Sequence, residues 1–132
     1  MSFTSTLLLG NTENANALIG TPIRVDEGYG HTGRVYTVAV HVSNFLGAVH
    51  IEAALVGDPT PDDWFNVIAP FRFPRPDTVL QNLGESAVVG FTVSGNYAWI
   101  RARMERDGLP EIPTGIPNPY GFVDRVLLNA SY

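Results

Sequence analysis

The stretch that decides the fold is Arg34-Val-Tyr-Thr-Val-Ala-Val-His-Val-Ser43, followed by Asn44-Phe-Leu-Gly47 and Ala48-Val-His-Ile-Glu-Ala-Ala-Leu-Val56. The two long segments alternate in polarity and are rich in β-branched residues, which is typical of strands, and the four residues between them are typical of a turn. The sequence therefore predicts an antiparallel hairpin. Because a hairpin this apolar is not stable alone in water, a second sheet has to cover it.

The rest of the chain adds short strands around this hairpin. Segments with strand character are residues 3–9, 18–25, 64–69, 86–94, 97–104 and 122–131. Pro22 cannot donate to a ladder, so it belongs at an edge or a bulge, and Gly95-Asn96 is a hairpin signal. Helical spacing is absent apart from one turn around residues 78–82. The pattern predicts an all-β fold, an antiparallel β-sandwich of jelly-roll or Ig-like type with about seven to nine strands.

Length and composition set the domain organisation and exclude some functions. A chain of 132 residues is expected to form one domain, residues 1–132, with an N-terminal arm at 1–9 and a long proline-rich loop at 105–121. No cysteine is present, and no apolar stretch has the length of a membrane span. The net charge of −5 argues against a nucleic-acid binder, because phosphate contacts need clustered cations.

Two histidines raise the question of a metal site. In the predicted hairpin, His41 and His50 lie opposite each other, and Glu52 shares a face with His50. Two imidazoles and a carboxylate are metal ligands. The alternative, which we favour, is a half-exposed sheet face with two neutral imidazoles.

An acidic turn raises the question of calcium. Asp58, Asp62 and Asp63 lie close to Glu52 in sequence, and carboxylate oxygens are calcium ligands. The segment is rich in proline, however, so we favour a turn with solvated or capping carboxylates. No nucleophile elbow or evident carboxylate pair is present either, and we predict no catalytic residues, no cofactor and no enzyme.

One predicted strand carries a stripe of aromatic residues and arginines. Tyr97, Trp99, Arg101 and Arg103 alternate with smaller or apolar residues, so they share one face. This composition is typical of a protein contact or of a sugar-stacking platform. The alternative is a sheet covered on both sides, with Tyr97 and Trp99 buried.

One tryptophan is expected in the core. Trp64 should pack between the sheets near Ile51 and Leu55, because a short turn returns the chain to the hairpin.

Further contacts with partner proteins are expected from the loop at 105–121 and the arm at 1–9. Apolar side chains exposed on a free loop favour aggregation, whereas against a neighbouring protein they stabilise the contact. The alternative is that the loop folds back over its own sandwich. The expected contact residues outside the stripe are Phe3, Leu7, Leu109, Ile112, Ile116 and Tyr120.

Three segments resemble small β-sandwich modules of tailed-bacteriophage virion proteins. They are Phe45-Leu-Gly-Ala-Val-His-Ile-Glu-Ala-Ala-Leu55, Asp58-Pro-Thr-Pro-Asp-Asp-Trp-Phe65 and Gly95-Asn-Tyr-Ala-Trp-Ile-Arg-Ala102. The resemblance covers roughly residues 34–106 and, weakly, the last strand. The long loop at 105–121 departs from the short turn expected in such modules.

The resemblance implies a structural virion protein that is made in the host cytoplasm. A capsid decoration or accessory protein is the first expectation, and a neck, tail or fibre-attachment component is the second. Its partners would be copies of itself, with a trimer as one form, and a larger shell or tail protein, but neither nucleic acid nor a membrane. The alternative is a carbohydrate-binding module that uses the aromatic and arginine face.

Overall fold

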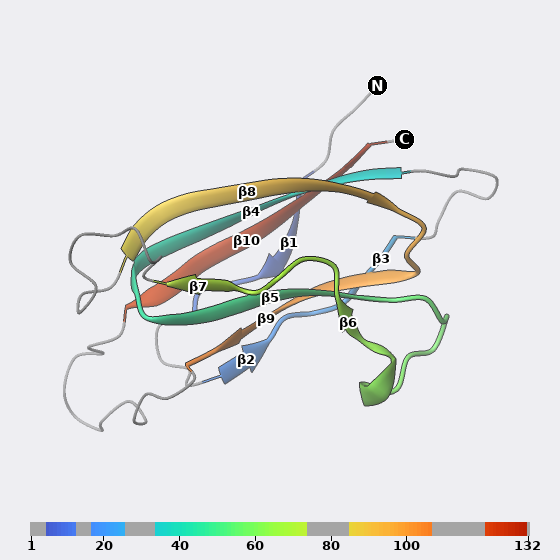
Figure 1. Ribbon diagram of the computed structural model, residues 1–132, viewed down its shortest axis with the longest axis horizontal. Coiled ribbons are helices and arrows are strands. Elements are labelled where there is room, and N and C mark those ends of the chain that lie inside the picture. Colours follow the sequence, from blue (N-terminus) through green and yellow to red (C-terminus); the bar gives the residue numbers. More distant parts are fainter. Residues whose placement is uncertain (1–4, 13–16, 26–33, 74–84, 107–120, 132) are drawn as a thin grey trace.

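The computed structural model describes residues 5–12, 17–25, 34–73, 85–106 and 121–131. These residues form two antiparallel sheets packed face to face, as Figure 1 shows, and the predicted all-β sandwich is confirmed. The strands are β1 (Ser5–Leu9), β2 (Ala17–Ile19), β3 (Ile23–Arg24), β4 (Arg34–Phe45), β5 (Gly47–Ala54), β6 (Phe65–Asn66), β7 (Phe71–Phe73), β8 (Glu85–Gly95), β9 (Trp99–Glu105) and β10 (Phe122–Ser131). A 3-10 turn, η1 (Pro61–Asp63), lies between β5 and β6.

The strand pairing is nested along the chain. Sheet A has the order β1-β10-β4-β8, and sheet B has the order β2-β9-β5-β6. Strand β3 also pairs with β9, and β7 also pairs with β5, so that each of these short strands continues an edge of sheet B. The early strands β1, β2, β4 and β5 thus pair with the late strands β10, β9, β8 and β6, in reverse order.

The predicted hairpin between β4 and β5 is wrong, because the chain changes sheets between the two strands. Strand β4 pairs with β8 and β10 in sheet A, whereas β5 pairs with β9 in sheet B. The connection uses Asn44 at φ 48° and Gly47 at φ 149°, and it buries Phe45 completely. A left-handed conformation suits asparagine and glycine. The two strands therefore face each other across the core instead of sharing hydrogen bonds.

The hairpin predicted at Gly95-Asn96 is wrong for the same reason. Strand β8 lies in sheet A and β9 lies in sheet B. In both places alternating polarity identified the strands correctly. The alternation shows which side chains point inward, however, and it does not distinguish two strands that pair from two strands that face each other.

The core lies between the inner faces of the two sheets. Val38, Val40 and Val42 of β4 are buried there, together with Val49 and Ile51 of β5. Strands β9 and β10 complete it with Ile100, Ala102, Met104, Val126 and Leu128. Aliphatic and β-branched side chains thus fill both inner faces, as expected for an aligned sandwich.

A buried arginine holds three connections together at one end of the sandwich. Arg106 is only 6% exposed and follows directly after β9. Its guanidinium donates to the carbonyl oxygens of Gly121 at 3.0 Å, Leu46 at 3.4 Å and Thr12 at 3.5 Å. It also lies 5.3 Å from the ring centre of Phe45. One side chain thereby links the segment after β1, the sheet change and the start of β10.

The predicted N-terminal arm is in part a strand of the chain's own sheet. Strand β1 pairs with β10, from Ser5 opposite Asn129 onward. The other proposed contact residues of these regions, and the helical turn predicted at 78–82, lie outside the described residues. These contact residues are Phe3, Leu109, Ile112, Ile116 and Tyr120.

The sheet change yields a first prediction, for Gly121→Ala. Gly121 has φ +65°, and a Cβ at this position would overlap the carbonyl groups of Asn44 and Ser43. The substitution should lower the free energy of unfolding by at least about 2 kcal/mol, because strain and overlap add. The measurement is urea denaturation followed by circular dichroism. Gly10→Ala is the matched control, since its Cβ would meet only Leu7 at 3.9 Å, and equal stability losses would contradict the described packing.

Candidate functional site

The outer face of sheet B carries the polar and aromatic side chains that the sequence singled out. Along β9, Ile100, Ala102 and Met104 are buried in the core, whereas Trp99, Arg101 and Arg103 alternate with them and are partly exposed. The predicted common face of these three residues is therefore confirmed.

Tyr97 does not belong to this face. It precedes the first residue of β9, so the alternation of the strand does not extend to it. Its ring lies 5.6 Å from that of Tyr36, which is buried, and 6.2 Å from that of Phe65. Tyr97 packs against the core between the sheets. For this residue the structure agrees with the alternative interpretation, in which its side chain is covered.

Five charged and polar side chains form a continuous network on the outer face of sheet B. Glu52 accepts from Arg101 Nε at 2.8 Å and from Arg103 Nε at 3.3 Å. Arg103 also donates from Nη1 to Glu105 at 2.9 Å, and the other oxygen of Glu105 lies 2.7 Å from His50 Nε2. Glu52 and His50 are 7% and 6% exposed. Each carboxylate therefore holds two partners in fixed positions.

Glu105 has an altered pKa. Burial on its own would raise the pKa of this carboxyl, but the hydrogen bonds and positive charge of His50 and Arg103 outweigh burial, and the pKa lies below its ordinary value of 4.5. Nδ1 of His50 is buried and has no hydrogen-bond partner among the described residues.

Trp64 lies over this network and not in the core, so its predicted position is wrong. Its ring stacks on the guanidinium of Arg101, 4.1 Å from the ring centre. The residue follows η1 and precedes β6, which pairs with the edge of β5 at Glu52 and Ala53. Leu55, its expected neighbour, lies beyond the end of β5 and is exposed.

A pocket of about 450 Å³ opens beside the stacked pair. Trp99 forms part of its wall, held by a hydrogen bond from its indole Nε1 to the carbonyl of Gly57 at 3.1 Å. Arg24 of β3 lies 5.5 Å from the centre of the Trp99 ring. The lining residues are Ile19, Pro22, Asp58, Pro59, Pro61, Trp64, Trp99 and Arg101.

The residues considered as metal ligands are not brought together. His41 lies opposite Val88 and Arg125 in sheet A, whereas His50 lies opposite Arg103 in sheet B. The expectation that His41 and His50 face each other is therefore wrong, because the strands that carry them are in different sheets. In the part of the chain that the structure describes, no three metal-binding side chains of histidine, aspartate or glutamate gather.

The acidic turn is organised by its own hydrogen bonds. The backbone N–H and the hydroxyl of Thr60 donate to Asp63 Oδ2 at 2.6 and 3.0 Å, and the backbone N–H of Asp63 donates to the carbonyl of Thr60 at 3.0 Å. Glu52, the fourth carboxylate considered for calcium, is the partner of two arginines instead. The capping interpretation therefore holds for Asp63.

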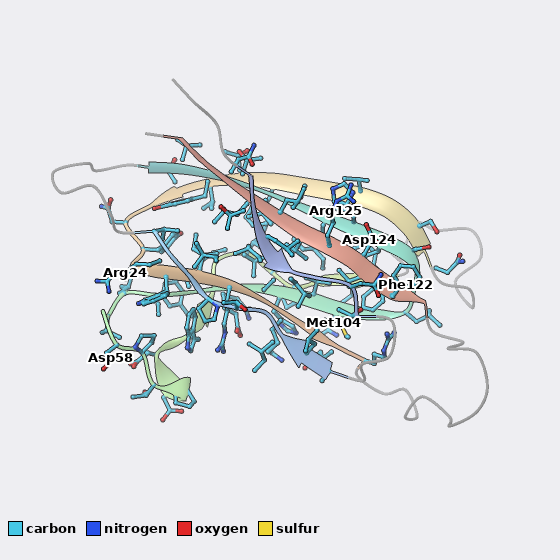
Figure 2. All side chains as sticks on the ribbon, turned by 180° about the vertical axis from the view of Figure 1, so that it is seen from behind. Arg24, Asp58, Met104, Phe122, Asp124 and Arg125 are labelled. Carbon is cyan, nitrogen blue, oxygen red and sulfur yellow. The ribbon has the colours of Figure 1, made fainter. Side chains whose placement is uncertain are left out.

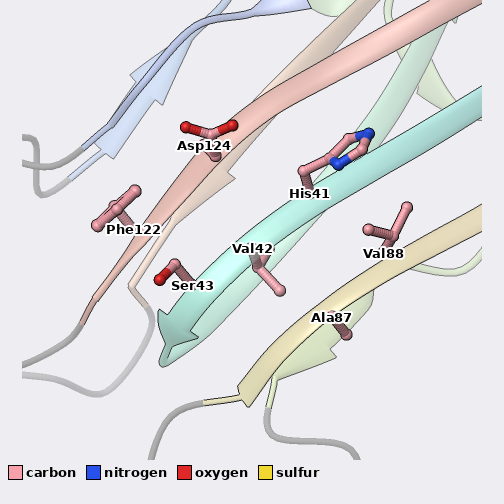
Figure 3. A pocket seen from close by; sticks show the side chains of 7 residues that line it. All are labelled: His41, Val42, Ser43, Ala87, Val88, Phe122 and Asp124. Carbon is pink, nitrogen blue, oxygen red and sulfur yellow. The ribbon is translucent and has the colours of Figure 1, made fainter.

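A second pocket, of about 430 Å³, lies on sheet A (Figure 3). His41 and Ser43 of β4, Val88 of β8 and Asp124 of β10 line it, together with Val42, Ala87 and Phe122. Asp124 pairs with Arg125 at 3.1 Å, and both side chains are well exposed. Asp58 and Asp124 lie at opposite ends of the molecule (Figure 2). The sheet B pocket is the better candidate site, because its aromatic rings and Arg101 are held in place by hydrogen bonds, an ion pair and stacking.

The sequence reasoning missed the partners that complete this site, which are Trp64, Arg24 and the proline-lined wall. The pair Trp64-Phe65 after a proline-rich turn predicts that the chain returns to the sheet. It does not predict on which face of the sheet the indole ring lies. No family model, no curated protein and no solved structure matches the chain. Among the described residues, no helix has the length and apolar character needed to cross a membrane.

The network yields a prediction for Glu52→Gln. Without the carboxylate charge, Arg101 and Arg103 lose their shared counter-ion on a largely covered face. The free energy of unfolding should fall by about 1–3 kcal/mol. Thermal and urea denaturation would measure the loss. Asp124→Asn is the matched control, because its ion pair is exposed and should contribute at most about 0.5 kcal/mol. A loss for Glu52→Gln no larger than that of the control would contradict a stabilising role of the network.

The lowered pKa of Glu105 yields a prediction about acid stability. A carboxyl whose pKa is lowered by folding contributes stability above its unfolded value, near 4.5, and this contribution is lost as the pH falls through the folded pKa. Glu105→Gln should therefore be less stable than the wild type at pH 7, and the difference should shrink as the pH falls below 4.5. Urea denaturation at a series of pH values measures this, and a difference independent of pH would contradict it.

Proposed function

We propose that this protein is a structural component of a tailed-bacteriophage virion, in first place a capsid decoration or accessory protein that acts through protein contacts. The resemblance of its segments around Phe45, Trp64 and Trp99 to virion β-sandwich modules supports this role. A neck, tail or fibre-attachment component remains the second form of the same proposal.

The strand order adds support at the level of architecture. In a jelly roll, eight strands form two sheets, and the first half of the chain pairs with the second half in nested order. Taking β2 with β3, and β6 with β7, as one interrupted strand each, the order in this chain corresponds to that plan. We therefore infer a jelly roll and not an Ig-like sandwich. Viral capsid domains and lectins both use this architecture, and the resemblance favours the former.

The edge of the sandwich at β1 is the strongest structural support for this proposal, because it offers a surface for a shell protein. Strand β1 is an edge of sheet A, and its sequence Ser-Thr-Leu-Leu-Leu has neither a charge nor a proline. The pairing of β1 with β10 shifts register between Leu7 and Leu9, and the outer side of this edge strand offers backbone groups for pairing with another chain. Leu7 on this edge is 53% exposed. A groove of about 250 Å³ runs between β1 and β2, lined by Leu7, Leu8, Leu9, Gly10, Leu18, Ile19, Gly20 and Thr21.

We assign the shell contact to this groove and edge. An apolar segment of a larger virion protein that lies along β1 would bury Leu7 and complete the hydrogen bonds of the edge. The exposed apolar groove supports this assignment, because exposed apolar surface on an otherwise acidic protein favours contact with a partner.

The proposal predicts that the protein is found on purified virions and that Leu7→Glu weakens its attachment. Virions purified from the source of this chain would be analysed by mass spectrometry, and stripped particles would be titrated with the recombinant variants. Leu7→Glu should weaken attachment at least about tenfold, because a charge would be buried in an apolar contact. Sedimentation of the free protein would test the expected homo-oligomer in the same samples.

Val88→Glu is the matched control. Val88 is 64% exposed on β8, at the opposite edge of sheet A, and should tolerate the charge with attachment unchanged. Absence of the protein from purified virions would contradict the proposed role. Equal attachment of the two folded variants would contradict the assignment of the contact to β1.

A further inference from the structure

The pocket on the outer face of sheet B has the size and the prearranged walls of a ligand site. Its volume of about 450 Å³ lies within the range of roughly 300–1,000 Å³ that is usual for small-molecule sites. Trp99 is fixed by its hydrogen bond to Gly57, and Trp64 is fixed by its stack on Arg101. A ligand would find both rings already in place and would lose little free energy in ordering them.

Two charged side chains line the pocket, and one is a hydrogen-bond donor while the other is an acceptor. Arg101 uses Nε for Glu52, and its terminal nitrogens have no hydrogen-bond partner among the described residues. Asp58 is exposed on the pocket wall. A guanidinium only donates, and an ionised carboxylate only accepts. The pocket therefore offers two indole rings, three proline rings and one group of each hydrogen-bonding kind.

Charges of both signs lie at or beside the pocket wall among the described residues. The cations are Arg24 and Arg101, and the anions are Glu52 and Asp58. A strongly anionic ligand would meet Asp58 in a chain that already carries a net charge of −5. A ligand without charge is therefore favoured, with an apolar surface for the rings and groups that both donate and accept.

We propose that this pocket binds a neutral hexopyranose unit of a saccharide. A pyranose ring has an apolar C–H face that stacks on an indole, and its hydroxyl groups can both accept from Arg101 and donate to Asp58. This deepens the carbohydrate-binding alternative raised by the sequence and gives it a defined place. The pocket lies on sheet B and shares one lining residue, Ile19 of β2, with the groove beside β1. The proposal does not rest on the virion role.

Tryptophan fluorescence tests the proposal directly, because both tryptophans of the chain line the pocket. The folded protein would be titrated with maltohexaose, cellohexaose, laminarihexaose, mannohexaose and β-1,4-galactohexaose. At least one of these neutral oligosaccharides should give a saturable change in emission, and saturation-transfer NMR should show contact with the ring protons. Trp99→Ala should weaken this binding at least about tenfold.

Two further variants keep the test independent of folding. Asp58→Ala changes an exposed side chain, so the protein should stay folded and bind the same oligosaccharide less tightly. Val88→Ala, on the outer face of sheet A, should bind it as tightly as the wild type. No saturable response to any of the five oligosaccharides, or equal affinity of wild type and Asp58→Ala, would overturn the proposal.

A proline-rich peptide is the rival ligand, because such peptides dock in aromatic grooves. Decaproline would be titrated in parallel with the oligosaccharides. Saturable binding of decaproline that is lost in Trp99→Ala, without saccharide binding, would also overturn the proposal. Failure of Leu7→Glu to affect virion attachment leaves this test untouched, so the two proposals fail separately.

Discussion

The passage of the chain from sheet A to sheet B between β4 and β5 is the constraint on which the other features depend. It places β4 and β5 on opposite sides of the core, and the inner faces of both sheets include these two strands. The passage occupies few residues and needs a left-handed Asn44, a positive φ at Gly47 and a fully buried Phe45. Arg106 stabilises it from the side through the carbonyl of Leu46.

The strand β5 explains why the outer face of sheet B is organised by charges. Both faces of this strand are buried, one in the core and one beneath the side chains of β9. Glu52 on the covered side would be costly as an isolated anion. Its two arginine partners offset that cost, and Arg101 in turn carries Trp64. The position of the Trp64 ring in the pocket thus depends, through Arg101, on a carboxylate of the neighbouring strand β5.

Much of the fold could be predicted from the sequence, because polar and apolar residues that alternate with a period of two are typical of β-strands. It located β4, β5, β8, β9 and β10, and it identified Trp99, Arg101 and Arg103 as sharing one face. The pairing could not be predicted, since a turn signal such as Gly95-Asn96 is the same for a hairpin and for a change of sheet.

The candidate site was predictable only in part, for a related reason. Its residues on β9 follow the strand period, whereas Trp64 and Arg24 reach the same place from other segments. Tyr97, two residues before the strand, packs against the core instead. Local patterns describe one strand at a time, and the pocket is a property of several segments that only the tertiary structure brings together.

The nested pairing also has a consequence for how the chain folds. Ser5 pairs with Asn129, so sheet A closes only when segments from opposite ends of the described chain meet. Contacts between such distant residues give a high contact order, which slows folding because a large loop must close before the contacts form. During synthesis, β1 and β4 leave the ribosome long before β10, their shared neighbour, is available. Until then the uncharged strand β1 has no partner in its sheet, so it is available to bind a chaperone or to pair with a neighbouring chain.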